Sequence, residues 1–227
     1  MESNVLYQKK AFIVGGTSSI GLETARKLAD EGCSVTVAGR HIDENDRNLF
    51  SSIILFDFEK EGFSFFDRED VKKVLESCDI LVNCYGPFVY RKLHETSVED
   101  WKTVAESDYA FAGALVSSVL KGMMERRNGS IILFGGTRTD SVKGYANNAA
   151  YAGAKTGIAV LVKSVSMEYG RFGICCNGIF PGFTRNAPQN TSIIQSAVIA
   201  DKVVYLLKQK ELNGVLLNVD RGWQPGL

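Results

Sequence analysis

A tyrosine and a lysine four positions apart, Tyr151 and Lys155, are the residues in this sequence best suited to acid–base chemistry. The segment 148–169 has the composition of a helix, and residues at positions i and i+4 of a helix share one face. A free phenol has a pKa of about 10, and a positive charge within about 4–6 Å lowers it. The pair is therefore a candidate proton donor and acceptor, although the same spacing also occurs on amphipathic helices that have no catalytic role.

A second candidate is a phosphate-binding turn near the N-terminus. The apolar run 11–14 predicts a buried strand, the pattern at 22–29 predicts a helix, and a glycine-rich turn joins them. Such a turn presents backbone N–H groups and the positive end of a helix dipole to a phosphate. A Gly-x-x-x-Gly-x-Gly pattern would need glycine at 19, where this chain has serine, so an ordinary strand-to-helix turn is the alternative. The residues expected at the phosphate are Gly15, Thr17, Ser18, Ser19, Ile20 and Gly21.

The residues after the next two predicted strands bear on which dinucleotide would bind. Strand 34–38 ends at Gly39-Arg40, without the acidic residue that holds a ribose hydroxyl in NAD-binding folds. Arg40 suits a 2′-phosphate, because a guanidinium forms paired charged hydrogen bonds to phosphate; a solvated arginine is the alternative. Asp57, at the end of strand 53–57, is expected either to cap a turn or to contact an adenine amino group.

Strands alternate with helices along the whole chain, which predicts one domain over residues 1–227 with a parallel sheet and helices on both faces. Ligands of such sheets bind at the carboxyl ends of the strands. Further strands are expected at 79–83, 130–134, 173–179 and 215–219, further helices at 69–77, 98–127 and 192–209, and a loop or a stub of helix at 43–48. The residues that fall at the carboxyl edge are Gly15, Arg40, Asp57, Asn83, Thr137 and Thr184.

The composition narrows the class of protein. A chain of 227 residues, 45% hydrophobic and 23% charged, suits one domain with a sizeable core. Lys+Arg and Asp+Glu both number 26, so there is no basic excess for nucleic acid or an anionic membrane. The five cysteines contain no Cys-x-x-Cys pair, the N-terminal residues are polar, and no run reaches the roughly 18 apolar residues of a membrane helix. We expect a cytoplasmic protein with reduced thiols and no metal site.

The motifs, taken in order, resemble those of the short-chain dehydrogenase/reductase family from Lys10 to Trp223. Tyr151-x-x-x-Lys155 matches the family's catalytic pair, and the glycine turn matches its cofactor-binding turn. The stretch 83–86 resembles its Asn-Asn-Ala-Gly, the stretch 177–182 is similar to the one that borders the nicotinamide, and 213–222 looks like its C-terminal strand. A likeness to 3-oxoacyl-carrier-protein reductases is visible, but it does not select a substrate.

The resemblance implies a Rossmann-type, doubly wound parallel sheet of about seven strands and an oxidoreductase that uses NADP(H) in preference to NAD(H). Tyr151 would exchange a proton with the oxygen of a carbonyl or alcohol substrate. Lys155 would lower the Tyr151 pKa and hold the nicotinamide ribose. The small-residue faces of 98–127 and 148–169 would pack against copies of themselves, and in the family these two helices build a dimer face, so a two-fold symmetric homo-oligomer, a dimer or a tetramer, is expected. Further residues implied to contact the cofactor are Asn83, Gly86, Pro181, Gly182 and Thr184.

Two departures from the family pattern affect the catalytic residues. The family has a serine about a dozen residues before the tyrosine; here we expect Thr137 to supply the hydroxyl, with Thr139 and Ser141 as weaker candidates. The family's asparagine in the long helix aligns with Asp108, whose negative charge would raise the pKa of both Lys155 and Tyr151. These departures leave a second interpretation open, a dinucleotide-binding sensor or scaffold with weakened catalysis.

Overall fold

Seven parallel strands form one sheet, in the order β3-β2-β1-β4-β5-β6-β7. The structure is a computed structural model, and it describes residues 4–184 and 192–223. The strand order reverses direction between β1 and β4, which is the doubly wound arrangement predicted from the sequence. The strands are β1 (Lys10–Val14), β2 (Ser34–Gly39), β3 (Ser52–Leu55), β4 (Ile80–Asn83), β5 (Gly129–Phe134), β6 (Ile174–Pro181) and β7 (Leu216–Val219).

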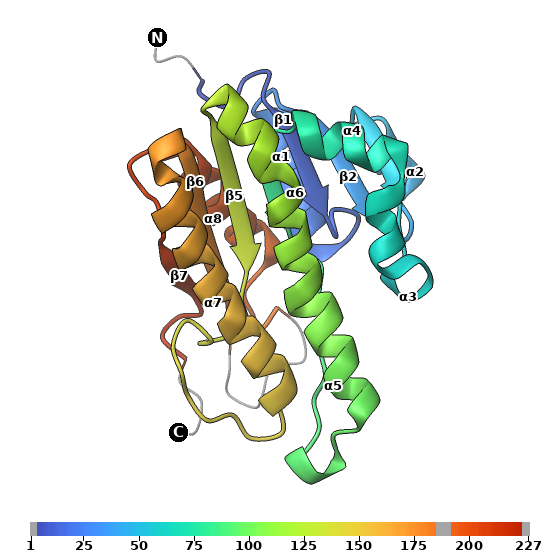
Figure 1. Cartoon of the computed structure of the whole chain (residues 1–227), viewed down its shortest axis with the longest axis vertical. Helices are drawn as coiled ribbons and strands as arrows, with labels where there is room; N and C mark the ends of the chain where they lie inside the picture. The colour runs from blue at the N-terminus through green and yellow to red at the C-terminus, as the bar shows by residue number, and fades with distance from the viewer. Residues whose placement is uncertain (1–3, 185–191, 224–227) are drawn as a thin grey trace.

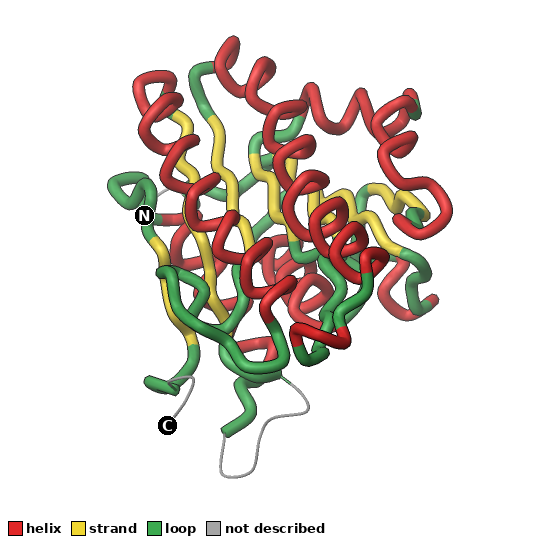
Figure 2. The backbone as a smooth tube through the Cα atoms, turned by 60° about the horizontal axis from the view of Figure 1, so that its bottom comes forward, coloured by secondary structure: helices red, strands yellow, loops and turns green. Residues whose placement is uncertain are grey.

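Helices cover both faces of the sheet (Figures 1 and 2). On one face pack α4 (Glu69–Ser77), α6 (Phe111–Arg126) and α7 (Ala149–Tyr169). On the other face pack α1 (Ser19–Asp30) and α8 (Ser196–Lys208). The predicted fold class is therefore confirmed. The shorter helices are α2 (Glu44–Arg47), α3 (Phe58–Glu61) and α5 (Val98–Val104).

The central strands are largely apolar because each one faces two cores. In β1, Phe12 and Val14 point into the core under α4, α6 and α7. Ala11 and Ile13 point into the core under α1 and α8. All four side chains are buried, as expected for a parallel sheet covered on both sides.

The helical segment predicted for residues 98–127 is helical in the structure from Val98 to Arg126 and contains one widened turn. A π-helical stretch, Ala105–Ala110, separates α5 from α6. The prediction of a long helical segment is therefore confirmed. The widened turn within it was not predicted, because a π turn holds more residues than an α turn and apolar periodicity does not reveal one such turn. The widened stretch contains Ser107 and Asp108, both of which are fully buried.

The carboxyl ends of all strands meet at one edge of the sheet, the lower edge in Figure 1. The loops that follow β1, β2, β4, β5 and β6 therefore lie along this edge and carry the residues expected at a ligand.

Three further observations concern the described residues only. Among them no helix has the length and apolar character needed to cross a membrane. No three His, Cys, Asp or Glu side chains in this part of the chain are grouped so that they could hold a metal ion. The five cysteines are free thiols.

Candidate active site

The centre of the site is a buried ion pair between Lys155 on α7 and Asp108 on the π-helical stretch. The Lys155 Nζ and Asp108 Oδ1 atoms are 2.9 Å apart. Lys155 is 5% exposed and Asp108 is 0% exposed. Lys155 also donates a hydrogen bond of 3.3 Å to the backbone oxygen of Phe134, the last residue of β5. Three elements thus hold the ammonium group in one place.

Tyr151 lies one turn before Lys155 on the same side of α7. The Lys155 Nζ is 5.7 Å from the centroid of the Tyr151 ring. Burial raises the pKa of Tyr151, the charge of Lys155 lowers it in part, and the charge of Asp108 raises it again. The pKa of Tyr151 is therefore raised, which favours the protonated phenol.

Lys155 and Asp108 each compensate the charge of the other. Burial alone would lower the pKa of Lys155, but Asp108 and Tyr151 together raise it above its ordinary value. Burial raises the pKa of Asp108, and Lys155 opposes that shift. Apart from the Lys155 ammonium, no group among the described residues donates a hydrogen bond to the Asp108 carboxylate, so this pair is the main compensation for its buried charge.

Gly86 lies against this ion pair. A Cβ at Gly86 would overlap Oδ1 of Asp108 and would lie 2.8 Å from Nζ of Lys155. Asn83, at the end of β4, accepts a hydrogen bond of 3.2 Å from the backbone N–H of Tyr85 and so shapes the turn that leads to Gly86. Asn83 thus ends β4 and Gly86 lies in the following loop beside the pair; their predicted contact with a cofactor stays a prediction.

The loop after β5 brings a glycine, rather than a serine, next to Tyr151. A Cβ at Gly136 would lie 2.9 Å from Cε1 of Tyr151 and 3.2 Å from Cγ2 of Thr139. The sequence interpretation did not single out Gly136. Its position two residues after the end of β5, close to where the family has its serine, could have indicated that it faces Tyr151.

The two threonines of this loop have different surroundings. The Thr137 hydroxyl donates a hydrogen bond of 2.9 Å to the backbone oxygen of Pro181 at the end of β6. The buried Thr139 hydroxyl accepts from the Gly136 N–H at 2.9 Å and is 3.1 Å from the Gly136 carbonyl oxygen, to which it donates. Thr139 therefore packs beside Gly136, which faces Tyr151. The Thr137 hydrogen bond instead links the loop after β5 to the end of β6. Ser141, the other weaker candidate, is exposed.

Glycines let the turn between β1 and α1 pack closely on itself and on the loop after β4. A Cβ at Gly21 would overlap the backbone oxygen of Gly15, and a Cβ at Gly15 would lie 2.9 Å from the backbone nitrogen of Tyr85. Ser18 is the N-cap of α1, but its side chain caps no N–H group. The first N–H groups of α1 are thus available to an anion.

The remaining residues of the turn support its shape. Ser19 has a left-handed backbone with φ of 50°, a conformation that glycine adopts at lower cost. Its hydroxyl oxygen is 3.3 Å from that of Ser196 at the start of α8. Thr17 packs so closely on Gly39 that a Cβ at Gly39 would overlap it, and Ile20 packs against the core under α1 and α8.

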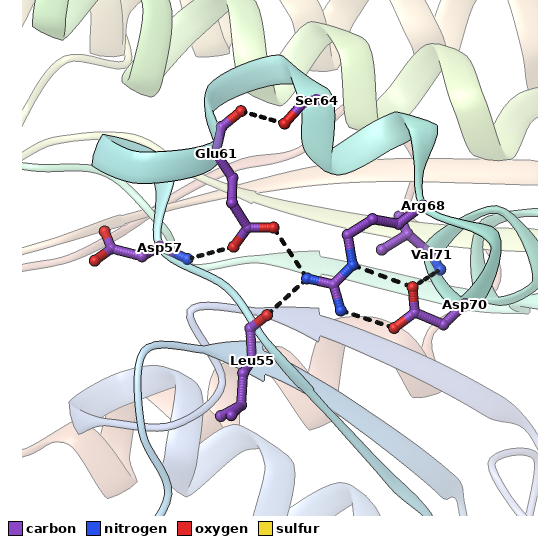
Figure 3. Close-up of polar contacts among 7 residues, drawn as sticks. All are labelled: Leu55, Asp57, Glu61, Ser64, Arg68, Asp70 and Val71. Carbon is purple, nitrogen blue, oxygen red and sulfur yellow. Dashed lines mark hydrogen bonds and ion pairs between the residues drawn. The ribbon is translucent and has the colours of Figure 1, made fainter.

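A polar network fixes the segment that follows β3 (Figure 3). Arg68 donates a hydrogen bond of 2.8 Å to the backbone oxygen of Leu55, the last residue of β3. Its guanidinium also pairs with Glu61 at 3.0 Å and Asp70 at 2.8 Å. Glu61 in turn accepts a hydrogen bond of 3.1 Å from the backbone N–H of Asp57. The start of this segment is therefore held to the sheet edge.

Asp57 and Arg40 differ in how freely they can reach a ligand. The Asp57 carboxylate accepts a hydrogen bond of 3.3 Å from the Glu59 N–H at the start of α3 and is 3.3 Å from the Lys60 ammonium. Of the two roles considered for Asp57, turn capping is the one observed. Arg40 is exposed and forms no ion pair within residues 4–184 and 192–223.

The end of β6 completes the edge. The Gly182 N–H donates a hydrogen bond of 2.9 Å to the backbone oxygen of Val219. A Cβ at Gly182 would lie 2.9 Å from Cα of Asp220, so the two backbones touch at this point. Pro181 precedes this contact and Thr184 follows it at a bend. The loop from Pro181 to Thr184 thus begins at the carboxyl edge.

A hollow of about 430 Å³ lies next to this site, on another face of α7. Its lining does not include Tyr151 or Lys155, so the acid–base centre lies outside it. The lining residues are Val142, Lys143, Gly144, Tyr145, Ala149, Ala152, Gly153 and Thr156.

The residues at the carboxyl edge fit a dinucleotide. A closed glycine turn and uncapped helix N–H groups suit a pyrophosphate, and the buried ammonium of Lys155 suits ribose hydroxyls. Arg40 is free to contact the adenosine end. These groups follow β1, β2 and β5 on one edge of the sheet.

Comparison with known proteins identifies the family. Residues 9–196 match the family described as short chain dehydrogenase. The 3-oxoacyl-[acyl-carrier-protein] reductase FabG of Buchnera aphidicola is 26% identical, and the match covers 95% of this chain and 97% of that protein. The 2-dehydro-3-deoxy-D-gluconate 5-dehydrogenase of Formosa agariphila is 28% identical over 77% of this chain and 69% of that protein.

Solved structures agree with this assignment. A short chain dehydrogenase/reductase family protein, 25% identical, superposes with a TM-score of 0.80 over 96% of this chain and 97% of that chain. The structure of gox2181, 21% identical, superposes with a TM-score of 0.81 over 98% of both chains and shows the shared fold alone. From the family match and these relatives we conclude that the chain belongs to the short-chain dehydrogenase family and is an NAD(P)-dependent oxidoreductase that acts on a CH–OH or carbonyl group.

Proposed function

We propose that this protein is an NADPH-dependent reductase of a carbonyl compound, with Tyr151 as the proton donor. The observation that carries the proposal is the position of Tyr151, half-buried at the carboxyl edge beside the buried Lys155–Asp108 pair. Because burial raises the pKa of Tyr151, the phenol keeps its proton near neutral pH. Carbonyl reduction needs this protonated form.

Each residue of the centre has a separate role in the proposal. When bound, the reduced nicotinamide supplies the hydride. Tyr151 gives its proton to the carbonyl oxygen, which gains negative charge during the reaction. The Lys155 ammonium stabilises the phenolate that remains and holds the ribose hydroxyls. Asp108 fixes the position of Lys155 through the ion pair. Thr137 is the proposed second hydrogen-bond donor to the substrate oxygen, and Thr139 is its rival.

The proposed contacts with the cofactor follow the carboxyl edge. Arg40 binds the 2′-phosphate, because its guanidinium is exposed and unpaired within the described part of the chain. The turn from Gly15 to Gly21 and the start of α1 bind the pyrophosphate. Around the rest of the cofactor, the proposed contacts are Asp57, Asn83, Gly86, Pro181, Gly182 and Thr184.

A second candidate function is that of a dinucleotide sensor with weakened catalysis. Two observations favour it: Gly136 brings no hydroxyl next to Tyr151, and Asp108 offsets the positive charge of Lys155. An intact Tyr151–Lys155 pair favours the enzyme.

Titration with NADPH, followed by assays with a 1,2-diketone and a quinone, separates the two candidates. We expect saturable NADPH binding and NADPH oxidation that depends on the carbonyl compound. Tyr151→Phe should bind NADPH as the parent does and lose turnover. Binding without turnover by the parent would support the sensor, and undiminished turnover by Tyr151→Phe would refute the proposed proton donor.

A further inference from the structure

Two aromatic side chains stand exposed beside the proposed proton donor. Phe88 is 59% exposed and Tyr90 is 62% exposed, although both are large and largely apolar. They follow Gly86, which contacts the Lys155–Asp108 pair, in the loop after β4. Exposed aromatic rings next to a reactive group are suited to ligand contact, because burying them under a ligand is favourable.

The Phe88 and Tyr90 rings form one aromatic wall, and the Tyr151 ring stands nearly perpendicular to Phe88. The Phe88 and Tyr151 ring centroids are 4.8 Å apart, and the ring planes are inclined by 81°. The Phe88 and Tyr90 rings are nearly parallel, inclined by 22°, with centroids 6.0 Å apart. Parallel rings at that separation are offset neighbours and leave no slot for a third ring between them. A flat ligand would therefore lie across them rather than between them.

The aromatic wall is tied to the helix that carries Tyr151. The Asn147 side-chain amide donates a hydrogen bond of 3.2 Å to the Tyr90 hydroxyl. Asn147 has a left-handed backbone with φ of 59° and lies just before α7. The loop after β4 and the start of α7 thus hold Phe88 and Tyr90 in a fixed relation to Tyr151, as a specificity-determining wall requires.

We propose that Phe88 and Tyr90 select a flat aromatic carbonyl compound as the substrate of this site. The inference rests on the proposed function. The substrate ring lies on the Phe88–Tyr90 wall and its carbonyl group reaches Tyr151. The carbonyl carbon gains a hydride from reduced nicotinamide, the electron pair of the breaking π bond moves to the oxygen, and the oxygen takes the Tyr151 proton. The products are an alcohol, the oxidised nicotinamide and the Tyr151 phenolate, which solvent reprotonates.

The choice of an aromatic substrate over an aliphatic one follows from ring–ring contact. Both kinds of substrate gain from burying apolar area against Phe88, but only an aromatic substrate also gains from the ring quadrupoles. That added gain corresponds to a preference of about 2- to 12-fold. A leucine at position 88 would keep an apolar surface of similar size and lose this added part.

The test compares kcat/KM for benzaldehyde and for cyclohexanecarbaldehyde, which match in size and differ in aromaticity. The two aldehydes also differ in intrinsic reactivity, so the deciding quantity is the change in their ratio between variants. Phe88→Leu should lower the aromatic preference by about 2- to 12-fold, with NADPH affinity unchanged. Phe63→Leu, which alters an exposed phenylalanine in the segment after β3, should leave the ratio as it is in the parent.

The outcomes separate this inference from the proposed function. An equal ratio in the parent and in Phe88→Leu, or turnover of an aliphatic 3-oxoacyl thioester alone, would overturn the aromatic preference and leave carbonyl reduction standing. Absence of turnover with aldehydes, diketones, quinones and thioesters alike would overturn both.

Discussion

Replacing Asp108 with asparagine is expected to move the pH dependence of catalysis to lower pH. Asparagine keeps the shape of aspartate and removes its negative charge. In the parent, that charge offsets the ammonium of Lys155 and helps to raise the pKa of Tyr151. In Asp108→Asn the ammonium acts on Tyr151 without this opposition, so the phenolate becomes more stable and the Tyr151 pKa falls.

The size of the shift follows from two distances. Lys155 Nζ lies 5.7 Å from the Tyr151 ring centroid. At an effective dielectric constant of about 20, unit charges at such a separation interact by about 3 kcal/mol. Asp108 Oδ1 is 2.9 Å from the same Nζ, so it lies no more than about 9 Å from the ring. There the opposing interaction is still about 2 kcal/mol. Removing it corresponds to a shift of about 1–2 pH units.

Both directions of the reaction report the same group. Reduction needs the protonated phenol and is lost as the pH rises through the Tyr151 pKa, whereas alcohol oxidation needs the phenolate and rises through that pKa. In Asp108→Asn, the fall of kcat for reduction and the rise of kcat for oxidation should therefore both occur at lower pH. The assay is kcat against pH for each direction at saturating cofactor. The matched control is Glu106→Gln, which removes an exposed carboxylate from the same π-helical stretch. Its profiles of kcat against pH should coincide with those of the parent.

Coinciding pH profiles in the parent and in Asp108→Asn would refute this reasoning: either the carboxylate has no net effect on Tyr151, or the buried Lys155 loses its proton once Asp108 no longer raises its pKa. A shift to higher pH would refute its sign. A lower kcat at every pH without a shift would show that Asp108 acts only by holding Lys155 in place.

Three other predictions concern the cofactor, the loop after β5 and assembly. Arg40→Ala should narrow the preference for NADPH over NADH by about 1.5–3 kcal/mol, read from dissociation constants of the two cofactors; equal constants in the parent would contradict a role for Arg40. Thr137→Ala should lower kcat by about 10²–10³ with NADPH affinity nearly unchanged, and Thr137→Ser should retain activity. If Thr139→Ala is the crippled variant instead, the hydroxyl beside Gly136 is the donor. Exposed apolar side chains on α5 and α7, such as Trp101 and Met167, predict a two-fold symmetric homo-oligomer, most simply a tetramer, and light scattering at micromolar concentration should give a mass well above 24.9 kDa.

The fold could be predicted because each strand and each long helix carries its own pattern. Strands buried on both faces are apolar throughout, and the helix predicted at 69–77 has those bounds in the structure. The π-helical turn at Ala105–Ala110 could not be predicted in this way, since it depends on how one turn packs between α5, α6 and α7. The resemblance to the family pointed to Asp108 as a site residue, but it did not show that Asp108 lies in a π-helical turn.

The site was predictable where local spacing determines proximity. Tyr151 and Lys155 share a helix face, and that spacing is a property of the helix itself. The place of Gly136 beside Tyr151 and the wall formed by Phe88 depend on how separate loops meet. Neither loop has a period that a sequence pattern could reveal, so these contacts required the three-dimensional structure.

The contact of Gly86 with the ion pair makes positions 86 and 108 interdependent in evolution, although they are far apart in the chain. Any side chain at position 86 overlaps Oδ1 of Asp108. Asparagine at 108 keeps an atom in the same place, so it brings no relief. A smaller residue at 108 removes this overlap and leaves only the Lys155 Nζ, 2.8 Å from the new Cβ, to move aside, so the effects of the two substitutions are non-additive. A substitution at position 86 therefore calls for a change at position 108 and a shift of the Lys155 ammonium, and a mutational library that varies one position at a time would miss such combinations.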